Sequence, residues 1–480
     1  MSGSVPTEIL VAVVVFAGYL VWKSTARKNN FPPGPRRWPL IGSVLEIPQT
    51  CQWKTFSKWA ETYGSIVYVD ALGQPIIVIN SAKVANDLLD KRGSIYSDRP
   101  IWSYSESWRQ QRKIVAQAFS PAAVRQYYPL QETEARKLVH GLLDDPSTLR
   151  RQTQLRIGAI ILRVAYGHYV TGENDPFLTT GLMALDFFTT AGIWAVDVLP
   201  ILRYIPSWLP GSGFLRIAKQ WRKIYMDAVW NPYLWCKKNL ATGAVLLPNF
   251  CAQYLVAEDV EISEEQEENL AWAALSVLGG GLDSNISSIF TFLLAMILNP
   301  SVQRKAQEEI DRVIGPDRLP VIQDRASLPY VRALMAEVFR WHPAVPLGIA
   351  HALTQDDMYD GMHLPKGSVV IPNVWHMLHD PEVYPNPMEF EPGRYQGLDS
   401  EMDKVTDISF GFGRRACPGK YFAEGTFFAV VSTVLATCEI SSIQDTEGNA
   451  VLPDISYTSG AISSQKALDL VHGYDDNEAY

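Results

Sequence analysis

One cysteine in this chain of 480 residues stands in a sequence context that suits metal chemistry. The segment FGFGRRACPG, residues 410–419, places glycines on both sides of Cys417 and Arg415 two residues before it. Because glycine has no side chain, the backbone can approach a large planar group here and direct amide N–H groups at the sulfur. Gly419 opens an apolar helix whose N-terminal dipole also favours a thiolate. The segment therefore predicts a metal-binding thiolate.

The neighbours of Cys417 limit which metal group it could bind. No His or Cys stands near it, and a single thiolate indicates haem rather than zinc. Arg415 could then contact an anionic group of the same ligand. The other four cysteines form no CxxC pair and are expected to be small buried hydrophobic residues. They are Cys51, Cys236, Cys251 and Cys438.

A long central helix is expected over residues 263–298. Ser263 and Gln266 have the spacing of a capping box, no proline follows until Pro300, and the second half is apolar nearly all round. At 1.5 Å per residue such a helix would be roughly 50 Å long. It should run through the centre of the protein.

Three glycines and an acid–alcohol pair interrupt this expected helix. Each of the glycines at 279–281 costs roughly 1 kcal/mol relative to alanine, so the close approach of a flat ligand or a bend should offset them. Equally, one helix could end at the glycines and a second one follow. Asp283 and Ser284 come next, and in apolar surroundings an Asp beside a Ser would make a plausible proton path.

A further set of charged residues lies towards the C-terminal end. Pro329 starts a predicted helix that Pro343 ends, and it carries Glu337 and Arg340 at i and i+3, on one face. Taken alone, this pair could be an ordinary surface ion pair. Arg394 follows in the segment FEPGRY.

Composition narrows the class of protein. The chain is 47% hydrophobic and 19% charged, which argues against disorder. Its net charge of −9 argues against a general nucleic-acid binder, which needs a basic surface. A hairpin is expected over residues 66–80, and most of the remaining chain has helical patterns. We therefore expect a mainly α domain with small β-sheets.

The N-terminal region predicts a membrane anchor. Ile9–Trp22 is an unbroken apolar run, followed by Lys23, Arg27 and Lys28, and this arrangement favours a single-pass anchor with the rest of the chain in the cytosol. A cleaved signal or a buried strand is the alternative. The expected organisation is an anchor with a basic stop at 1–28, a proline-rich hinge at 29–40 and a catalytic domain at 41–480.

Together these motifs resemble the cytochrome P450 monooxygenases, in the family's order and over essentially the whole chain. Phe410-x-x-Gly413-x-Arg415-x-Cys417-x-Gly419 is similar to the family's long and specific haem-binding signature. Other resembling segments are the helix that contacts the haem propionates, the oxygen-activating stretch, and the buried Glu–Arg–Arg network. In this sequence they are Trp108-x-x-x-Arg112, residues 280–284, and Glu337-x-x-Arg340 with Arg394. Segments such as RWHPAVPLG resemble basidiomycete members associated with secondary metabolism.

The resemblance implies a role for each matched residue. Cys417 would be the axial ligand of haem b, and Asp283 and Ser284 would deliver protons to bound dioxygen. Glu337, Arg340 and Arg394 would form a structural network. The residues implied to hold the propionates are Trp108, Arg112, His351 and Arg415. The family usually has Thr where Ser284 stands, so the coupling of oxygen use to product could differ.

The resemblance also implies an activity, partners and a location. The enzyme would insert one oxygen atom of O2 into a lipophilic small molecule, most simply a terpenoid-like metabolite. It would use electrons from an NADPH–cytochrome P450 reductase and work at the endoplasmic reticulum membrane. Substrate contacts are expected from residues 272–278, 345–349 and 458–462, which are mainly apolar.

Three alternatives stay open. The enzyme could oxidise aromatic, steroid or xenobiotic compounds with broad specificity. It could be a haem-thiolate isomerase or dehydratase without a reductase, although that predicts loss of the acid–alcohol pair. It could also bind haem without catalysis, because the stretch at 101–107 is much shorter than is usual in the family.

Overall fold

The computed structural model describes residues 16, 18, 30–100, 105–190, 204–206, 208, 209, 211–244, 248–257, 262–395, 397–444, 447 and 449–465. Nearly all of the expected anchor, residues 101–104 of the short stretch and the C-terminal 15 residues lie outside this part of the chain. The membrane anchor therefore stays a prediction.

The described part is mainly helical with small sheets, which confirms the expected fold class apart from the anchor. Its α-helices are α2 (Gln52–Tyr63), α3 (Ala82–Ala85), α4 (Gly93–Tyr96), α5 (Ser105–Ala118), α6 (Tyr128–Asp144), α7 (Leu149–Tyr166), α8 (Pro176–Thr190), α10 (Gly213–Ala241), α11 (Phe250–Ala257), α12 (Glu264–Leu298), α13 (Pro300–Val313), α14 (Pro329–Trp341), α15 (Val374–His379), α16 (Asp399–Phe410) and α17 (Lys420–Thr437). Short 3-10 or π turns are η1 (Val44–Glu46), η2 (Asn86–Lys91), η3 (Ala123–Tyr127), η4 (Pro146–Thr148), η6 (Ile322–Ser327), η7 (Pro392–Tyr395) and η8 (Gly413–Arg415).

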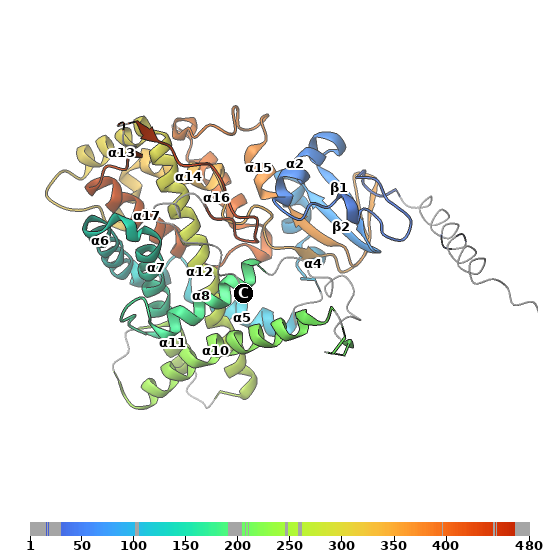
Figure 1. Cartoon of the computed structure of the whole chain (residues 1–480), viewed down its shortest axis with the longest axis horizontal. Helices are drawn as coiled ribbons and strands as arrows, with labels where there is room; N and C mark the ends of the chain where they lie inside the picture. The colour runs from blue at the N-terminus through green and yellow to red at the C-terminus, as the bar shows by residue number, and fades with distance from the viewer. Residues whose placement is uncertain are drawn as a thin grey trace, which may run out of the picture.

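The largest sheet has four strands in the order β1-β2-β6-β3. The expected hairpin forms its first two strands, which pair antiparallel with Ile66 opposite Ile79, whereas β2 and β6 run parallel. The strands of the three sheets are β1 (Ile66–Ala71), β2 (Gln74–Ile79), β3 (His351–Ala352), β4 (Asp357–Tyr359), β5 (Met362–Leu364), β6 (Val369–Pro372), β7 (Ile443–Gln444) and β8 (Ala450–Val451). Figure 1 shows β1, β2 and α2 at one end of the molecule and α6, α7, α13 and α17 at the other.

Helix α12 runs between these two ends, through the middle of the molecule (Figure 1). It begins at the predicted capping box, in which the Ser263 side chain accepts from the Gln266 amide, and it continues without a break for 35 residues. The structure therefore contains one helix, not two helices separated at the glycines. Its second half is buried because it packs in the single large core cluster.

Among the described residues, α12 is the helix with the length and apolar composition of a membrane span. However, 72% of its apolar window is buried inside the protein. Because a membrane span exposes its apolar surface to lipid, we assign α12 to the protein core.

Candidate active site

The Cys417 loop connects the turn η8 to helix α17. The Cys417 amide donates to the carbonyl of Phe410 at 2.7 Å, which closes the loop on itself. Gly413 has a φ of +54°, and a Cβ there would overlap the carbonyl oxygen of Leu89. The glycine is therefore needed twice, for its backbone conformation and for the close approach of η2.

The Cys417 thiol is desolvated inside the protein, although the residue as a whole keeps accessible surface. Burial nevertheless raises the pKa of the thiol, while a hydrogen bond from the Gly419 amide and the positive charges of Arg112 and Lys420 act to lower it. A group that is both desolvated and accessible faces an internal space rather than the outer surface. A thiolate there is held by an amide and by nearby cations, as a metal-ligating thiolate requires.

Guanidinium groups gather around this loop. Arg112 donates to the carbonyl of Ala416 and Arg415 donates to the carbonyl of Ser97. Trp108 lies between the two, with the Arg415 guanidinium carbon 3.3 Å and that of Arg112 5.6 Å from its ring centroid. The predicted residues Trp108, Arg112, Arg415 and Cys417 are thus brought together.

Arg99 belongs to the same cluster, although sequence reasoning missed it. It donates to the carbonyls of Ile349 and Ala350 at 2.5 and 2.6 Å. Burial and then the charges of Arg415 and Arg112 lower the pKa of Arg99 to about 10. Its only sequence signal is the charged pair Asp98-Arg99 before a proline, and that pattern does not indicate hydrogen-bond partners 250 residues further along the chain.

These arginines repel one another, and an anion would relieve that repulsion. Burial, followed by the charge of Arg112, lowers the pKa of Arg415 to about 10, and its buried Nη1 has no hydrogen-bond partner. An accessible thiolate beside an excess of guanidinium groups is the donor set that haem needs, because haem brings an iron and two propionates. Within the described residues no group of three or more His, Cys, Asp and Glu side chains could hold a metal ion. The residues present therefore fit haem.

His351 lies next to this cluster, and its protonation state limits how it could bind a propionate. Its Nδ1 lies 2.8 Å from the Tyr96 carbonyl, so Nδ1 carries the proton. Burial, followed by the charge of Arg99, lowers the pKa of His351 to about 3. A neutral imidazole in this tautomer has no donor left at Nε2, so His351 could bind a propionate only as imidazolium, which a nearby anion favours.

One stripe of α12 stays accessible although most of the helix is buried. The stripe recurs every four residues: Ser276 and Gly280 are exposed, and Trp272 and Ser284 are half-buried. A Cβ added at Gly280 would meet nothing within 4 Å. The glycine segment therefore leaves space along this stripe, as the approach of a flat ligand would require.

Asp283 and Ser284 lie at the end of that stripe. The Ser284 hydroxyl donates to the Gly280 carbonyl at 2.7 Å, which leaves its lone pairs free to accept. Burial, and then the charge of Asp186, raise the pKa of Asp283 to about 6, although Arg150 opposes the shift. Asp283 can therefore gain and lose a proton near neutral pH.

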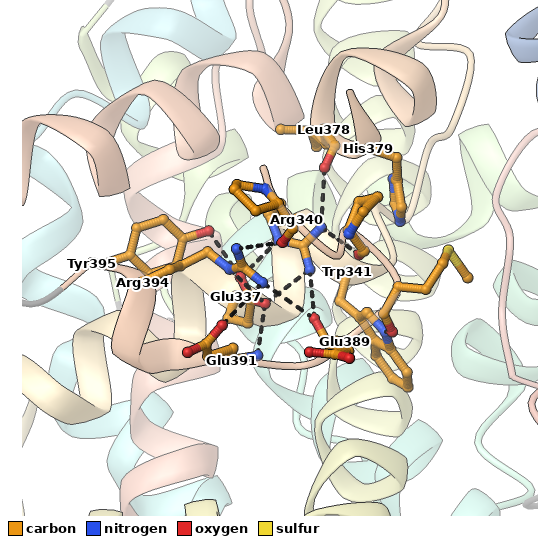
Figure 2. Close-up of polar contacts among 12 residues, drawn as sticks. Glu337, Arg340, Trp341, Leu378, His379, Glu389, Glu391, Arg394 and Tyr395 are labelled. Carbon is orange, nitrogen blue, oxygen red and sulfur yellow. Dashed lines mark hydrogen bonds and ion pairs between the residues drawn. The ribbon is translucent and has the colours of Figure 1, made fainter. Parts of the chain in front are cut away.

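Glu337, Arg340 and Arg394 meet in the interior rather than at the surface. Two parallel hydrogen bonds of 2.8 Å join Arg340 to Glu337, and both side chains are fully buried. Arg394 Nε donates to Glu337 at 3.2 Å and the Tyr395 hydroxyl donates at 2.9 Å. Figure 2 shows these groups converging on the Glu337 carboxylate. Tyr395 had not been singled out from the sequence.

Hydrogen bonds of the adjoining residues bring two of the segments expected to contact substrate, 345–349 and 458–462, to α12. The Ser463 amide donates to the Ala344 carbonyl at 2.8 Å, and the Ser287 hydroxyl of α12 donates to the Ser463 carbonyl at 2.6 Å. The segments at 345–349 and 458–462 therefore lie next to each other beside α12.

Comparisons with known proteins identify the family. The cytochrome P450 family model matches residues 32–462. Cytochrome P450 monooxygenases 105 and 45 of Postia placenta are 52% and 53% identical, over 95% and 91% of this chain and 92% and 86% of theirs. Cytochrome P450 monooxygenase claR of Ampulloclitocybe clavipes is 38% identical over 96% of this chain and 89% of its own. The accessible thiolate, the arginine cluster and these matches lead to one conclusion: the chain belongs to the cytochrome P450 family and is a cytochrome P450 monooxygenase.

Proposed function

We propose that this monooxygenase inserts one oxygen atom of O2 into a lipophilic small molecule, a terpenoid-like metabolite, with electrons from an NADPH–cytochrome P450 reductase. The observation that carries the proposal is the accessible residue Cys417 beside guanidinium groups that outnumber the carboxylates around them. When bound there, haem supplies the iron at which dioxygen is activated.

In this proposal each residue near Cys417 has one task. Cys417 would ligate the iron, and the Gly419 amide, the charges of Arg112 and Lys420 and the α17 dipole would favour its thiolate against the effect of burial. Arg112, Arg415 and Arg99 bind the propionates, and Trp108 keeps the guanidinium of Arg415 in place by stacking. His351 would bind a propionate only when it is protonated.

Asp283 and Ser284 carry protons to the oxygen site. A carboxyl group with a pKa of about 6 is protonated in a useful fraction of molecules at neutral pH. The Ser284 hydroxyl can accept a proton and pass on its own, after its bond to the Gly280 carbonyl opens. The proposal requires the accessible stripe of α12 to border the same space as Cys417.

The substrate would lie against apolar side chains of residues 272–278 of α12 and of the segments 345–349 and 458–462. Ile349 is 49% exposed although it follows the buried helix α14, so it offers apolar surface to a ligand. Ser276 and Ser284 are the hydroxyls of the accessible stripe, and they would orient one polar group of the substrate.

The proposed location is the endoplasmic reticulum membrane, with residues 9–22 as a single-pass anchor and the catalytic domain in the cytosol. Lys113 and Arg414 are exposed and would contact an acidic reductase. Lys420 contributes less, because it forms an ion pair with Asp407 at 2.7 Å.

The haem ligand is tested by a difference spectrum of the reduced protein with carbon monoxide. We expect the Soret band of a thiolate-ligated haem, and we expect Cys417→Ala to abolish it. The control is Cys438→Ala, which removes a half-buried cysteine of the α17 C-terminus and should keep the band. A normal band in Cys417→Ala would rule out this ligand.

Activity is tested by turnover with NADPH and reductase against terpenoids, steroids and polycyclic aromatics. Terpenoid products support the proposal, whereas products from all classes support broad specificity. Haem binding without any NADPH-dependent product would support the isomerase or non-catalytic alternatives.

We expect Ser284→Ala to keep haem but to release several-fold more hydrogen peroxide per NADPH consumed. An unchanged ratio of product to NADPH would exclude a role of Ser284 in proton delivery.

A further inference from the structure

A cavity of about 150 Å³ lies between α6, α7 and residues 168–172. Helices α6 and α7 lie side by side at the helical end of the molecule (Figure 1). None of the residues that line the cavity belongs to the candidate active site. Arg163 lines the cavity, and Ile161, two residues before it on α7, packs against Gly281 of α12. Because two residues turn a helix by about 200°, the cavity and the glycine segment lie on opposite faces of α7.

The cavity carries more positive than negative charge. Among its lining residues, Lys137, Arg156 and Arg163 are cationic and Glu134 is the one carboxylate. Lys137 occupies one oxygen of Glu134 at 2.6 Å. Arg156 Nη1 is 3.6 Å from the other oxygen, too far for a hydrogen bond, and Arg156 Nη2 donates to the Gln152 Oε1 atom at 3.4 Å. Neither that Glu134 oxygen nor Arg156 Nε has a hydrogen-bond partner.

Of the three cations that line the cavity, Arg163 is the one for which the described residues supply no carboxylate contact. It is 93% buried, and its Nη1 donates to the Gly167 carbonyl at 3.1 Å. Its guanidinium carbon lies 3.4 Å from the Tyr169 ring centroid, and its buried Nε has no hydrogen-bond partner. Burial lowers the pKa of Arg163, as expected for a cation without a counter-ion. Because burying an unpaired charge is costly, an anion is expected beside it.

The positions of the two arginines define the shape of the site. Arg156 and Arg163 are seven residues apart, so they lie on the same face of α7, two turns from each other. Ala159 lies between them, and Leu155 and Val170 add apolar surface to the lining. A cavity of 150 Å³ accommodates a ligand of roughly the size of benzene. The ligand therefore combines a small anionic head with a short apolar stem.

We propose that this cavity is a binding site for a small monocarboxylate with an apolar stem of a few carbons. The carboxylate would lie between the guanidinium groups of Arg156 and Arg163, which are suited to planar two-oxygen anions. The stem would lie against Leu155 and Val170. The site is separate from the haem and the substrate, and it does not depend on the proposed substrate class.

The test is isothermal titration calorimetry of the haem-loaded full-length protein with butyrate as the probe. We expect binding at one site, and at least tenfold weaker binding of butan-1-ol, which has the same stem without the charge. The haem Soret band should stay unchanged over the same butyrate range, because the ligand does not reach the iron. No binding, equal binding of the alcohol, or a Soret shift that follows the binding curve would each overturn the proposal.

Variants then locate the site. Arg163→Gln and Arg156→Gln should each weaken butyrate binding at least tenfold. Ala159→Leu should do the same by filling the cavity, and it removes no buried charge, so it tests the site even where Arg163→Gln folds poorly. Arg151→Gln is the matched control, because Arg151 is an arginine of the same helix that pairs with Glu173 and does not line the cavity. Unchanged binding in Ala159→Leu and Arg156→Gln would show that butyrate binds elsewhere. Inorganic phosphate that binds more tightly than butyrate would also contradict a carboxylate site.

Discussion

At the scale of single residues, the buried carboxyl group of Asp283 lowers the stability of the folded protein and is proposed to deliver protons. Raising the pKa of a carboxyl from 3.8 to about 6 means that its ionised form is disfavoured in the folded protein by roughly 3 kcal/mol. Such costs are common where catalysis needs a group that titrates near the working pH. The cost is expected to vanish when the charge is removed.

We therefore expect Asp283→Asn to be more stable and less active. The folded protein binds the Asp283 proton more tightly than the unfolded chain does, so the penalty is absent below about pH 4, grows up to about pH 6 and stays constant above it. Urea unfolding should show a gain of roughly 1–3 kcal/mol at pH 8 and little gain at pH 4. Turnover should fall at least tenfold. The same stability gain at both pH values would contradict the assigned pKa.

At the scale of elements, α12 uses adjacent glycines for different purposes. A Cβ at Gly281 would lie 2.7 Å from Ile161 Cδ1 of α7, whereas a Cβ at Gly280 would meet no atom within 4 Å. Gly281 therefore permits close helix packing, and Gly280 keeps space open on the accessible stripe. The sequence alone shows three equivalent glycines.

The two glycines should respond differently to alanine. Gly280→Ala should raise the free energy of unfolding by up to about 1 kcal/mol, since helix propensity improves without a clash. It should also weaken haem loading or substrate binding, because the methyl group enters the open space. Gly281→Ala is the control and should gain less, because Ile161 must move. Chemical unfolding measures the change in stability, and the carbon monoxide difference spectrum measures haem loading. An equal gain in unfolding free energy for the two variants would argue against different roles for Gly280 and Gly281.

Helix α14 is held to the segment before α16 by a buried ion network. Besides Glu337, Arg340 donates to the carbonyls of Leu378, Pro387 and Glu389 at 2.8–3.1 Å. The Trp341 indole donates to the Met388 carbonyl at 2.8 Å (Figure 2). The Arg340 side chain therefore satisfies a carbonyl of α15 and two carbonyls of the irregular stretch between α15 and η7.

Loss of the Glu337 charge should be costly. Glu337→Gln leaves two buried guanidinium groups without their carboxylate, so we expect unfolding free energy to fall by roughly 3–5 kcal/mol. The control is Arg332→Gln, also on α14, which removes a partly exposed ion pair with Asp399 of α16 and should cost under about 1 kcal/mol. Thermal unfolding and recovery of folded, haem-loaded protein would check both. Similar losses in the two variants would mean that burial of the network contributes little.

At the scale of the whole molecule, the rings of two histidines are buried in neutral form where the C-terminal segment, α14 and α15 meet. His342 Nε2 lies 3.0 Å from the Ser463 hydroxyl, and its ring stacks on Tyr457 at 3.3 Å. His379 stacks on Trp375 at 3.9 Å. Burial lowers the pKa of His379 to about 3 and that of His342 far below 6.5. The fold therefore depends on both rings staying neutral.

This burial predicts a steep loss of stability in acid. Below about pH 6.5 the unfolded chain protonates both histidines and the folded protein does not, so each lowers the unfolding free energy by about 1.4 kcal/mol per pH unit. The urea concentration at the unfolding midpoint should therefore decrease as the pH is lowered from 6.5 to 4. His379→Gln should reduce the slope by about one proton, whereas His140→Gln, at an exposed position, should leave it unchanged. A flat pH profile would refute the neutral assignment.

The sequence by itself determined what depends on local spacing. The capping box at Ser263, the proline-bounded helix α14, the hairpin of β1 and β2 and the glycine-flanked Cys417 are all local patterns, and the structure forms each of these elements. Chemistry that needs one residue with its near neighbours, such as a thiolate at a helix start, is therefore predictable from spacing.

Only the tertiary structure decided which distant groups meet. Arg99, 318 positions before Cys417, joins the arginine cluster because β3 and the loop before it position its carbonyl acceptors. The burial of Glu337, the separate uses of Gly280 and Gly281, and the charged cavity beside α7 likewise depend on packing. The reason is physical: desolvation and Coulomb interactions act through space, and residue types and spacing along the chain do not specify those distances.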